Sequence, residues 1–156
     1  MYSQEKKKTN YNMQIIKITP ESGEHGKYTN DKIADFLFKH LDQFGDERKA
    51  IMQCLRYVFN DSHGGFIVIG VEGDEILGAV IINKTGMEGY IPENILVYIA
   101  VDGKMRGRGL GKELMNETIE EANGSIALHV EPDNPAKHLY EKLGFTNKYL
   151  EMRLIK

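Results

Sequence analysis

The stretch Met105-Arg106-Gly107-Arg108-Gly109-Leu110-Gly111-Lys112-Glu113-Leu114 places glycines and arginines directly before a helical pattern. The start of a helix leaves about four backbone N–H groups unpaired and carries roughly half a positive charge. Glycines let the backbone bend so that these groups converge, and they let an anion approach without meeting a Cβ atom. The two arginines add guanidinium donors that suit phosphate oxygens. The stretch therefore predicts a turn that binds a phosphate or a pyrophosphate.

Two common phosphate-binding loops do not fit these residues. The mononucleotide loop needs Gly-Lys followed by Ser or Thr, whereas Gly111-Lys112 is followed by Glu113. The dinucleotide loop needs Gly-x-Gly-x-x-Gly after the first strand of a domain. Here the third glycine comes one position early, and several apolar runs precede the stretch. The turn is therefore of another kind.

The flanking sequence alternates between strand and helix patterns. Residues 95–101 form the most apolar run, which is typical of a strand covered on both faces. Asn134 is suited to cap a later helix, with Pro135 in its first turn and Gly144 just past its end. The predicted strands are 13–18, 66–71, 76–82, 95–101, 125–130 and 149–154, and the predicted helices are 30–44, 46–59, 110–122 and 134–143.

This order predicts one α/β domain over residues 12–156, preceded by a flexible tail at residues 1–11. A net charge of −3 argues against nucleic acid as the main partner. No apolar run approaches the roughly 20 residues of a membrane span, and no secretory signal is evident, so a cytoplasmic location is expected. The single cysteine, Cys54, lies in an apolar helical stripe and is predicted to be a core residue; it offers no framework for a metal.

Two segments together resemble the GNAT superfamily of N-acetyltransferases. Val101-x-x-x-x-Arg106-x-x-Gly109-x-Gly111, after an apolar strand and at the start of a helix, is similar to the acyl-CoA signature of that superfamily. Leu139-Tyr140-Glu141-Lys142-Leu143-Gly144-Phe145 resembles its second landmark, about 30 residues later. The resemblance implies a mixed, mostly antiparallel central sheet of 6–7 strands flanked by about four helices. It also implies acetyl-CoA as co-substrate, with no metal.

The resemblance further implies which residues hold the cofactor. Backbone N–H groups of residues 107–112 would bind the pyrophosphate, and strand 95–101 would pair with the pantetheine arm. Backbone N–H groups near residues 99–101 would stabilise charge on the acetyl oxygen. An asparagine expected seven residues before the tyrosine is replaced by Asp133, with Asn134 one later, and either could contact the cofactor. The implied binding residues are Ile99, Ala100, Val101, Arg106, Gly107, Arg108, Gly109, Leu110, Gly111, Lys112 and Asn134.

Catalysis by direct attack needs a proton for the departing thiolate, and the resemblance assigns this role to Tyr140. From spacing alone, Tyr140 is instead a core aromatic on the inner face of its helix. Glu93 is the candidate general base, by a loose match to an acidic residue near the start of the strand. Tyr98, Glu88, His129 and a water molecule passing a proton to backbone carbonyls are its rivals.

The acceptor is predicted to be a primary amine of a small molecule or peptide. Residues 60–100 carry six acidic side chains and one basic one, which would attract a cationic amine. Helices 30–44 and 46–59 are expected to shape the acceptor pocket together with the 83–94 loop. A CoA-binding sensor without turnover and a nucleotide-phosphate protein are the alternative functions. A homodimer is expected only because dimers are common in the superfamily.

Overall fold

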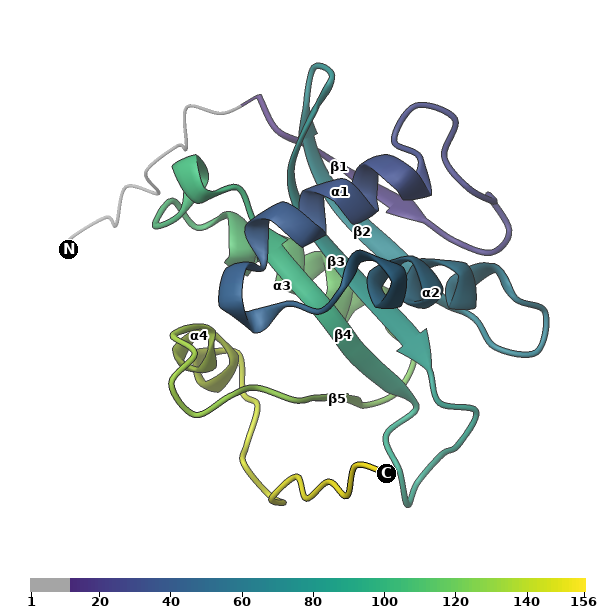
Figure 1. Cartoon of the computed structure of the whole chain (residues 1–156), viewed down its shortest axis with the longest axis vertical. Helices are drawn as coiled ribbons and strands as arrows, with labels where there is room; N and C mark the ends of the chain where they lie inside the picture. The colour runs from purple at the N-terminus through teal and green to yellow at the C-terminus, as the bar shows by residue number, and fades with distance from the viewer. Residues whose placement is uncertain (1–11) are drawn as a thin grey trace, which may run out of the picture.

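A single mixed sheet organises the protein, whose computed structural model describes residues 12–156. The predicted tail at residues 1–11 lies outside the described residues. The strands are β1 (Gln14–Ile18), β2 (Gly65–Glu72), β3 (Glu75–Lys84), β4 (Asn94–Val101) and β5 (Ile126–Leu128), in the order β1-β2-β3-β4-β5. The first four pair antiparallel, and β5 pairs parallel to β4 (Figure 1). The predicted mixed, mostly antiparallel sheet is therefore confirmed.

Residues 12–156 contain four α-helices, which pack around this sheet. They are α1 (Asn30–His40), α2 (Arg48–Phe59), α3 (Leu110–Glu121) and α4 (Ala136–Lys142), with short 3₁₀ turns η1 (Asp42–Phe44) and η2 (Gly103–Met105). Helices α1 and α2 lie on the face of the sheet that is nearer the viewer in Figure 1, and α3 lies on the opposite face. Among residues 12–156, no helix combines the length and the hydrophobicity that a bilayer crossing requires.

Helix α1 begins where the sequence predicts but ends earlier. The Thr29 hydroxyl accepts a hydrogen bond from the Lys32 N–H (3.3 Å), so Thr29 is the N-cap. The helix stops at His40 rather than at Phe44, because Asp42 has a φ of 51° and an α-helix cannot continue through a left-handed residue. Residues 42–44 form η1 instead.

The alternation of side chains along the strands divides the core between the two faces. Ile67, Ile69 and Ile81 pack with α1 and α2, whereas Val68 and Val80 pack with the α3 side. Strand β4 contributes to both cores, which confirms that the most apolar run is covered on both faces. Cys54 is buried on the α2 side, as predicted for a core residue.

The predicted last strand does not form. Residues 149–154 are in no strand, so the described sheet has five strands rather than 6–7, and β5 is shorter than the predicted 125–130. Leu150, Met152 and Leu154 are 84%, 89% and 85% exposed. Their alternation predicts an amphipathic strand, but strand formation also needs an edge to pair with, and alternation does not supply one.

Candidate active site

The space beside the backbone of Gly107 and Gly109, in the turn before α3, is not filled by other residues. Gly109 is the N-cap of α3 with a φ of 83°, and Gly107 has a φ of 77°. A Cβ atom built on either glycine would meet no heavy atom within 4 Å. The Glu113 N–H bonds back to the Gly109 carbonyl (3.1 Å), so the N–H groups of residues 110–112 precede the helix ladder. The local geometry is that of an anion-binding helix start.

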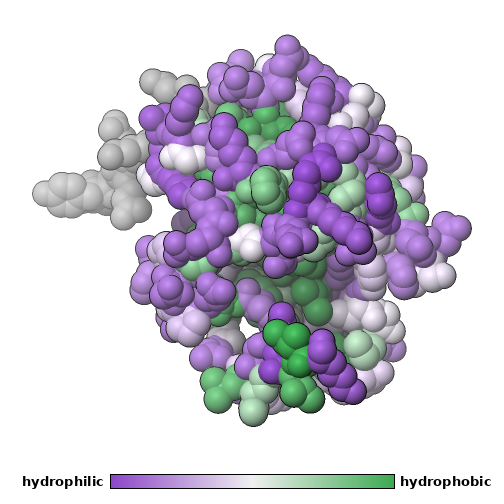
Figure 2. Space-filling model, in the orientation of Figure 1, coloured by the Kyte–Doolittle hydropathy of each residue, from purple (hydrophilic) through white to green (hydrophobic). Residues whose placement is uncertain are grey.

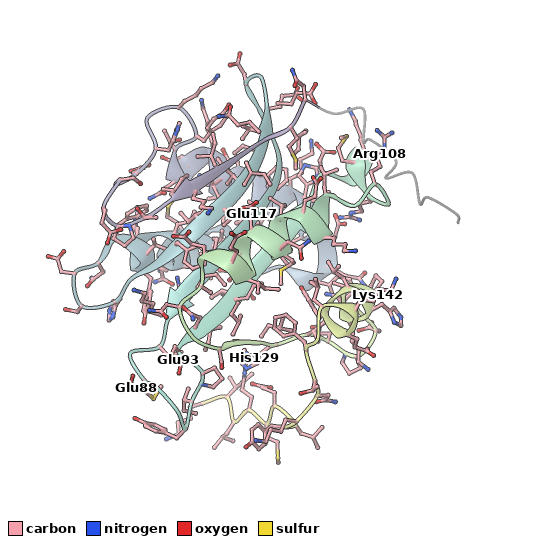
Figure 3. The ribbon with its side chains drawn as sticks, turned by 180° about the vertical axis from the view of Figure 1, so that it is seen from behind. Glu88, Glu93, Arg108, Glu117, His129 and Lys142 are labelled. Carbon is pink, nitrogen blue, oxygen red and sulfur yellow. The ribbon has the colours of Figure 1, made fainter. Side chains whose placement is uncertain are left out.

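The two arginines of the turn, Arg106 and Arg108, lie in different surroundings. The Arg106 guanidinium donates to the His40 carbonyl (2.9 Å) and to Asp42 Oδ2 (3.1 Å), which ties the turn to the end of α1. Arg108 lies on the turn itself (Figure 3). Arg106 was predicted to bind phosphate, and its contacts give it a role in holding the turn in place.

A second set of contacts holds the strand-to-turn connection. The Asp102 N–H donates to the Leu77 carbonyl (2.8 Å), and the Gly103 N–H donates to Nδ1 of His40 (3.3 Å). Burial lowers the pKa of His40 from its ordinary value, which favours the neutral ring that can accept this bond. Sequence reasoning missed His40 and Asp42, because they lie more than 60 residues from the turn and carry no motif.

The edge of β4 is open beside this turn. Pairing of β5 with β4 is confined to Asn94–Leu96, so no described strand pairs with residues 97–101 on that side. The register with β3 passes from Leu96 to Tyr98 and skips Val97, which makes Val97 a bulge residue. The predicted pantetheine-binding residues Ile99, Ala100 and Val101 therefore lie on a stretch of strand with a free edge.

Tyr140 lies in α4 on the α3 side of the sheet. Its ring is buried in the same core as Leu96, with half-buried Ile99 beside that core, and it packs against Phe145 with centroids 5.8 Å apart. No hydrogen bond to its hydroxyl is found among residues 12–156, and no fully buried side-chain N or O there lacks a partner, so the hydroxyl oxygen is not completely enclosed by protein. Burial raises the pKa of Tyr140 to about 12.

The glycine turn, the free edge of β4 and Tyr140 all lie within residues 28–145. The Acetyltransferase (GNAT) family model matches this range. The chain belongs to the GNAT acetyltransferase family. A relative in Bacillus subtilis (strain 168), described as the uncharacterized N-acetyltransferase YvbK, is 30% identical over 140 residues. That match covers 86% of this chain and 77% of the relative.

Solved structures share the GNAT fold. PH1933 from Pyrococcus horikoshii OT3 has a TM-score of 0.66 at 23% identity, covering 90% of this chain and 92% of that one. Aminoglycoside N-acetyltransferase AAC(6')-Iy in complex with CoA has a TM-score of 0.65 at 17% identity, covering 92% and 94%. The fold class is thereby confirmed, and family membership makes this chain an acyltransferase; GNAT enzymes use acetyl-CoA as acyl donor.

In this GNAT chain, residues at the two ends of α4 determine where the helix begins and ends. The N-cap residue of α4 is Pro135, and the Asn134 Oδ1 atom one position earlier accepts a hydrogen bond from the N–H of Ala136, the first helical residue (2.9 Å), so the Asn134 side chain provides the capping bond while Asp133 is exposed. Gly144 has a φ of 100° just past the helix end, as predicted. The Asn134 cap fixes the start of the short helix on which Tyr140 sits.

Two of the candidate general bases, Glu93 and Tyr98, already form hydrogen bonds with other residues of the protein. Glu93 Oε2 accepts from the Ser125 N–H (2.6 Å) and Oε1 accepts from the Gly89 N–H (3.3 Å). Hydrogen bonds from its own N–H, from Ser125 and from Gly89 lower the pKa of Glu93, which weakens it as a base. The Tyr98 hydroxyl donates to Asp46 Oδ2 (2.6 Å), and burial with this bond raises its pKa, so it stays protonated.

Two further rivals, Glu88 and His129, are exposed. Figure 3 places Glu88, Glu93 and His129 toward the same end of the sheet, away from Arg108. Glu93 immediately precedes β4, and His129 immediately follows β5. Glu93 therefore lies at the paired start of β4 and β5, whereas His129 lies where β5 leaves β4, because Leu128 is paired with Leu96.

The acidic excess of residues 60–100 is divided by the fold. Glu72, Asp74 and Glu75 lie at the β2–β3 hairpin, whose end of β3 pairs with Val101 beside the glycine turn. Glu88 and Glu93 lie near the opposite end of the sheet. Asp74 is also paired with Lys27 (2.8 Å). The six acidic residues of this segment therefore do not gather at one place, because the hairpin carries three of them to the other end of the sheet.

Proposed function

We propose that this GNAT enzyme moves an acetyl group from acetyl-CoA to a primary amine of a small molecule or peptide, with Tyr140 as general acid. The observation that carries the proposal is the Tyr140 side chain: its ring is held in the core beside β4, while its hydroxyl has no described partner. A structural tyrosine in a core normally finds a hydrogen-bond partner. A hydroxyl left available beside an open strand edge is suited to donate to a substrate.

Binding would use the helix start and the strand edge. The N–H groups of residues 107–112 would hold the diphosphate, supported by the positive charges of Arg108 and Lys112. Residues 97–101 would pair with the amide-containing arm, as an added strand pairs with a sheet edge. Arg106 would act through its contacts with Asp42 and the His40 carbonyl, and Asn134 through its cap of α4.

Acetyl-CoA supplies an activated acetyl thioester, and the residues of this chain manage charge and protons around it. The amine nitrogen forms a bond to the acetyl carbon as the carbon–sulfur bond breaks. N–H groups near Ile99–Val101 would stabilise negative charge on the acetyl oxygen. The nitrogen releases its remaining extra proton to solvent as the amide forms, the thiolate takes the Tyr140 proton, and Tyr140 is reprotonated from solvent. Burial raises the pKa of Tyr140 to about 12, which keeps the phenol protonated at neutral pH until a thiolate forms beside it.

The amine must lose a proton before it attacks. Neutralising an ammonium with a pKa of ~10.4 at pH 7 costs about 4–5 kcal/mol. Glu93 was predicted to accept this proton, but its hydrogen bonds and lowered pKa favour a structural role. We propose that the proton leaves through water at the backbone of β4, a route that needs no basic side chain.

The Tyr140→Phe substitution tests the acid. We expect kcat to fall about 100-fold or more, since general acid catalysis contributes that much, with an unchanged Kd for acetyl-CoA in isothermal titration. Turnover is followed by thiol release with a panel of primary amines. Tyr149→Phe, at a tyrosine that is 78% exposed, is the matched control.

Three results would contradict the proposal. An unchanged rate in Tyr140→Phe would remove Tyr140 as the acid. A wild-type protein that binds acetyl-CoA but acetylates no amine would instead be a CoA-binding sensor. Tighter binding of ATP than of acetyl-CoA would indicate a nucleotide-phosphate protein.

A further inference from the structure

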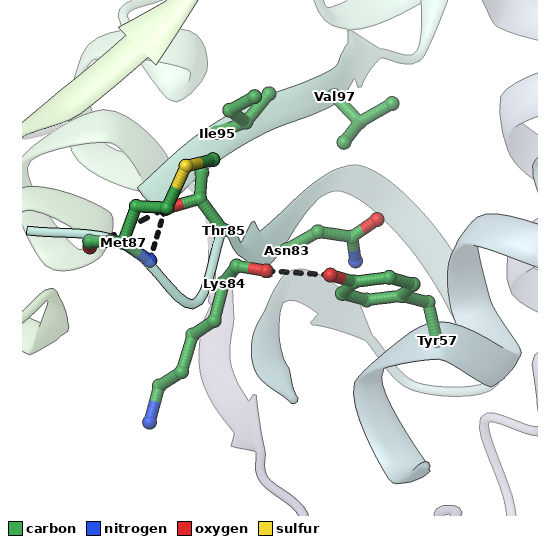
Figure 4. Close-up of a pocket in the computed structure, with 7 residues that line it drawn as sticks. All are labelled: Tyr57, Asn83, Lys84, Thr85, Met87, Ile95 and Val97. Carbon is green, nitrogen blue, oxygen red and sulfur yellow. Dashed lines mark hydrogen bonds between the residues drawn. The ribbon is translucent and has the colours of Figure 1, made fainter. Parts of the chain in front are cut away.

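A hollow of about 290 Å³ opens on the α2 side of β4. Its wall is formed by Tyr57, Asn83, Lys84, Thr85, Met87, Ile95 and Val97 (Figure 4). These residues come from α2, from the end of β3 and the loop after it, and from β4, which are among the segments expected to shape an acceptor pocket. The volume is near the lower end of the ~300–1,000 Å³ typical of ligand pockets, so it suits a small group.

The hollow and Tyr140 lie on opposite faces of the same part of β4. Leu96 packs in the core that contains Tyr140, whereas Tyr98 packs in the α1 and α2 core. Val97, the bulge residue between them, lines the hollow and is 37% exposed. Pairing with β5 ends at Leu96, so the hollow borders the place where the sheet opens. An acceptor in the hollow would therefore approach this opening from the side opposite to the proposed acid.

The polar side chains of the wall are already engaged with the protein. The Tyr57 hydroxyl donates to the Lys84 carbonyl (2.7 Å), as Figure 4 shows. Asn83 Nδ2 donates to the Cys54 carbonyl (3.2 Å), and its Oδ1 accepts from the Cys54 thiol (3.3 Å). The Thr85 hydroxyl donates to the Pro92 carbonyl (2.8 Å) and accepts from the Met87 N–H (3.1 Å).

What remains for a ligand is mainly hydrocarbon and sulfur surface. The side chains of Met87, Ile95 and Val97 and the ring of Tyr57 supply it. Figure 4 shows the Lys84 ammonium extended away from Ile95 and Val97. No carboxylate belongs to the wall, and its one charged side chain is positive, so the hollow has nothing that selects a polycation.

We propose that this hollow binds the apolar side group of the acceptor, which is a small primary amine carrying one aryl or branched alkyl group. The inference rests on the proposed function, since it names the substrate class of that reaction. The apolar group is removed from water against Met87, Ile95 and Val97, and this places the nitrogen at the β4 opening. Polyamines and aminoglycosides, which need several anionic partners, are poor acceptors.

The first test compares 2-phenylethylamine with ethylamine, spermidine and kanamycin as acceptors. Each methylene-sized contact in an apolar pocket is worth about 10-fold or more, so we expect kcat/KM for 2-phenylethylamine to exceed that for ethylamine at least about 10-fold. Spermidine and kanamycin are expected to be slower than 2-phenylethylamine. A preference for either polycation would overturn the inference and leave the proposed acetyl transfer standing.

The second test changes the wall by Met87→Gln, a substitution at a partly exposed side chain (39%) that is expected to leave the fold intact. We expect kcat/KM for 2-phenylethylamine to fall about 10-fold, with ethylamine turnover and the KM for acetyl-CoA unchanged. Met152→Gln makes the same chemical change at a methionine that is 89% exposed and outside the hollow, and it is expected to have no effect. Equal losses for both amines, or none, would contradict the inference.

Binding alone gives a readout that does not depend on turnover. In saturation-transfer NMR with CoA present, 2-phenylethylamine should bind the wild-type protein and Met152→Gln, with a weaker signal for Met87→Gln. If no amine is acetylated while this pattern holds, the proposed reaction fails and the hollow is still an apolar amine site. If the three proteins give equal signals or none, the inference fails.

Discussion

At the scale of single residues, Glu93 joins two loops through its carboxylate. Bonds from its own N–H, from Ser125 and from Gly89 lower its pKa below the ordinary 4.5. A carboxyl group with a depressed folded-state pKa stabilises the fold above its unfolded pKa, and this contribution is lost as the pH falls through the folded value. We expect Glu93→Gln to lower the free energy of unfolding at pH 7, with a difference from wild type that narrows below about pH 4.5.

Chemical denaturation at neutral and acidic pH measures this effect, and amine acetylation at pH 7 supplies the catalytic readout. Glu88→Gln, in the same loop region but without a side-chain hydrogen bond among the described residues, is the control. We expect Glu93→Gln to keep most of the wild-type turnover. If its turnover instead fell by about 100-fold or more while stability was unchanged, Glu93 would be the general base.

What the sequence could predict at this scale was local. The start of α1 at Asn30, the capping bond of Asn134 and the turn at Gly144 follow from residues within a few positions, and the structure confirms each. The contacts of Arg106 with the end of α1 join residues 64 and 66 positions apart, and Glu93 reaches a residue 32 positions away. Such pairings depend on how α1 and the α3–β5 loop pack on the sheet, and no spacing rule encodes them.

At the scale of elements, the start of α3 depends on the left-handed backbone of Gly109. Gly109→Ala adds a methyl group that meets no atom within 4 Å, so any effect comes from the φ of 83°. We expect a loss of about 1–2 kcal/mol in the free energy of unfolding, with weaker binding of acetyl-CoA because the turn relaxes. Denaturant titration and calorimetric titration measure the two effects.

Gly103→Ala is the matched control for that change. Gly103 also has open space at its Cβ position, but its φ is not positive, and alanine keeps the N–H that donates to His40. It should alter stability and acetyl-CoA affinity little. If Gly109→Ala bound acetyl-CoA as tightly as Gly103→Ala, the glycine turn would not be the diphosphate site.

The sequence predicted helices and strands well where their burial shows as a pattern of apolar residues. It did not predict features that depend on how two strands pair. The apolar run of β4 was predicted within one residue of its observed start, because a strand covered on both faces needs uniform hydrophobicity. The bulge at Val97 left no trace in that run, although it shapes the edge of both the proposed donor and acceptor sites. A bulge is a property of register with β3, and register is set between strands rather than along one.

At the scale of the whole molecule, the sheet separates two working sides. The α3 and α4 side carries Tyr140, and the α1 and α2 side carries the apolar hollow, with β4 common to both. The contacts between Arg106 and Asp42 connect the glycine turn with the helical layer on the hollow's side. In the proposed reaction the acyl donor and the amine would lie on the two sides of β4 and meet where β5 leaves it.

The C-terminal segment is the largest departure of the whole molecule from sequence expectation. Five large apolar side chains there are 78–89% exposed: Tyr149, Leu150, Met152, Leu154 and Ile155. Green side chains gather at the bottom of Figure 2, where Figure 1 places the C-terminus. Exposed apolar patches promote association, so we expect this segment to cause self-association of the wild-type protein.

Replacing Leu150, Met152 and Leu154 together with serine tests both the exposure and its consequence. Surface substitutions usually change the free energy of unfolding by less than about 0.5 kcal/mol each, so stability should change little, while light scattering during size exclusion should show less self-association. Leu114→Ala, at a fully buried side chain of α3, should lose about 2–5 kcal/mol and so calibrates the scale. If the triple variant were destabilised as much as Leu114→Ala, residues 149–154 would be packed in solution, as the alternating pattern predicts for a sixth strand.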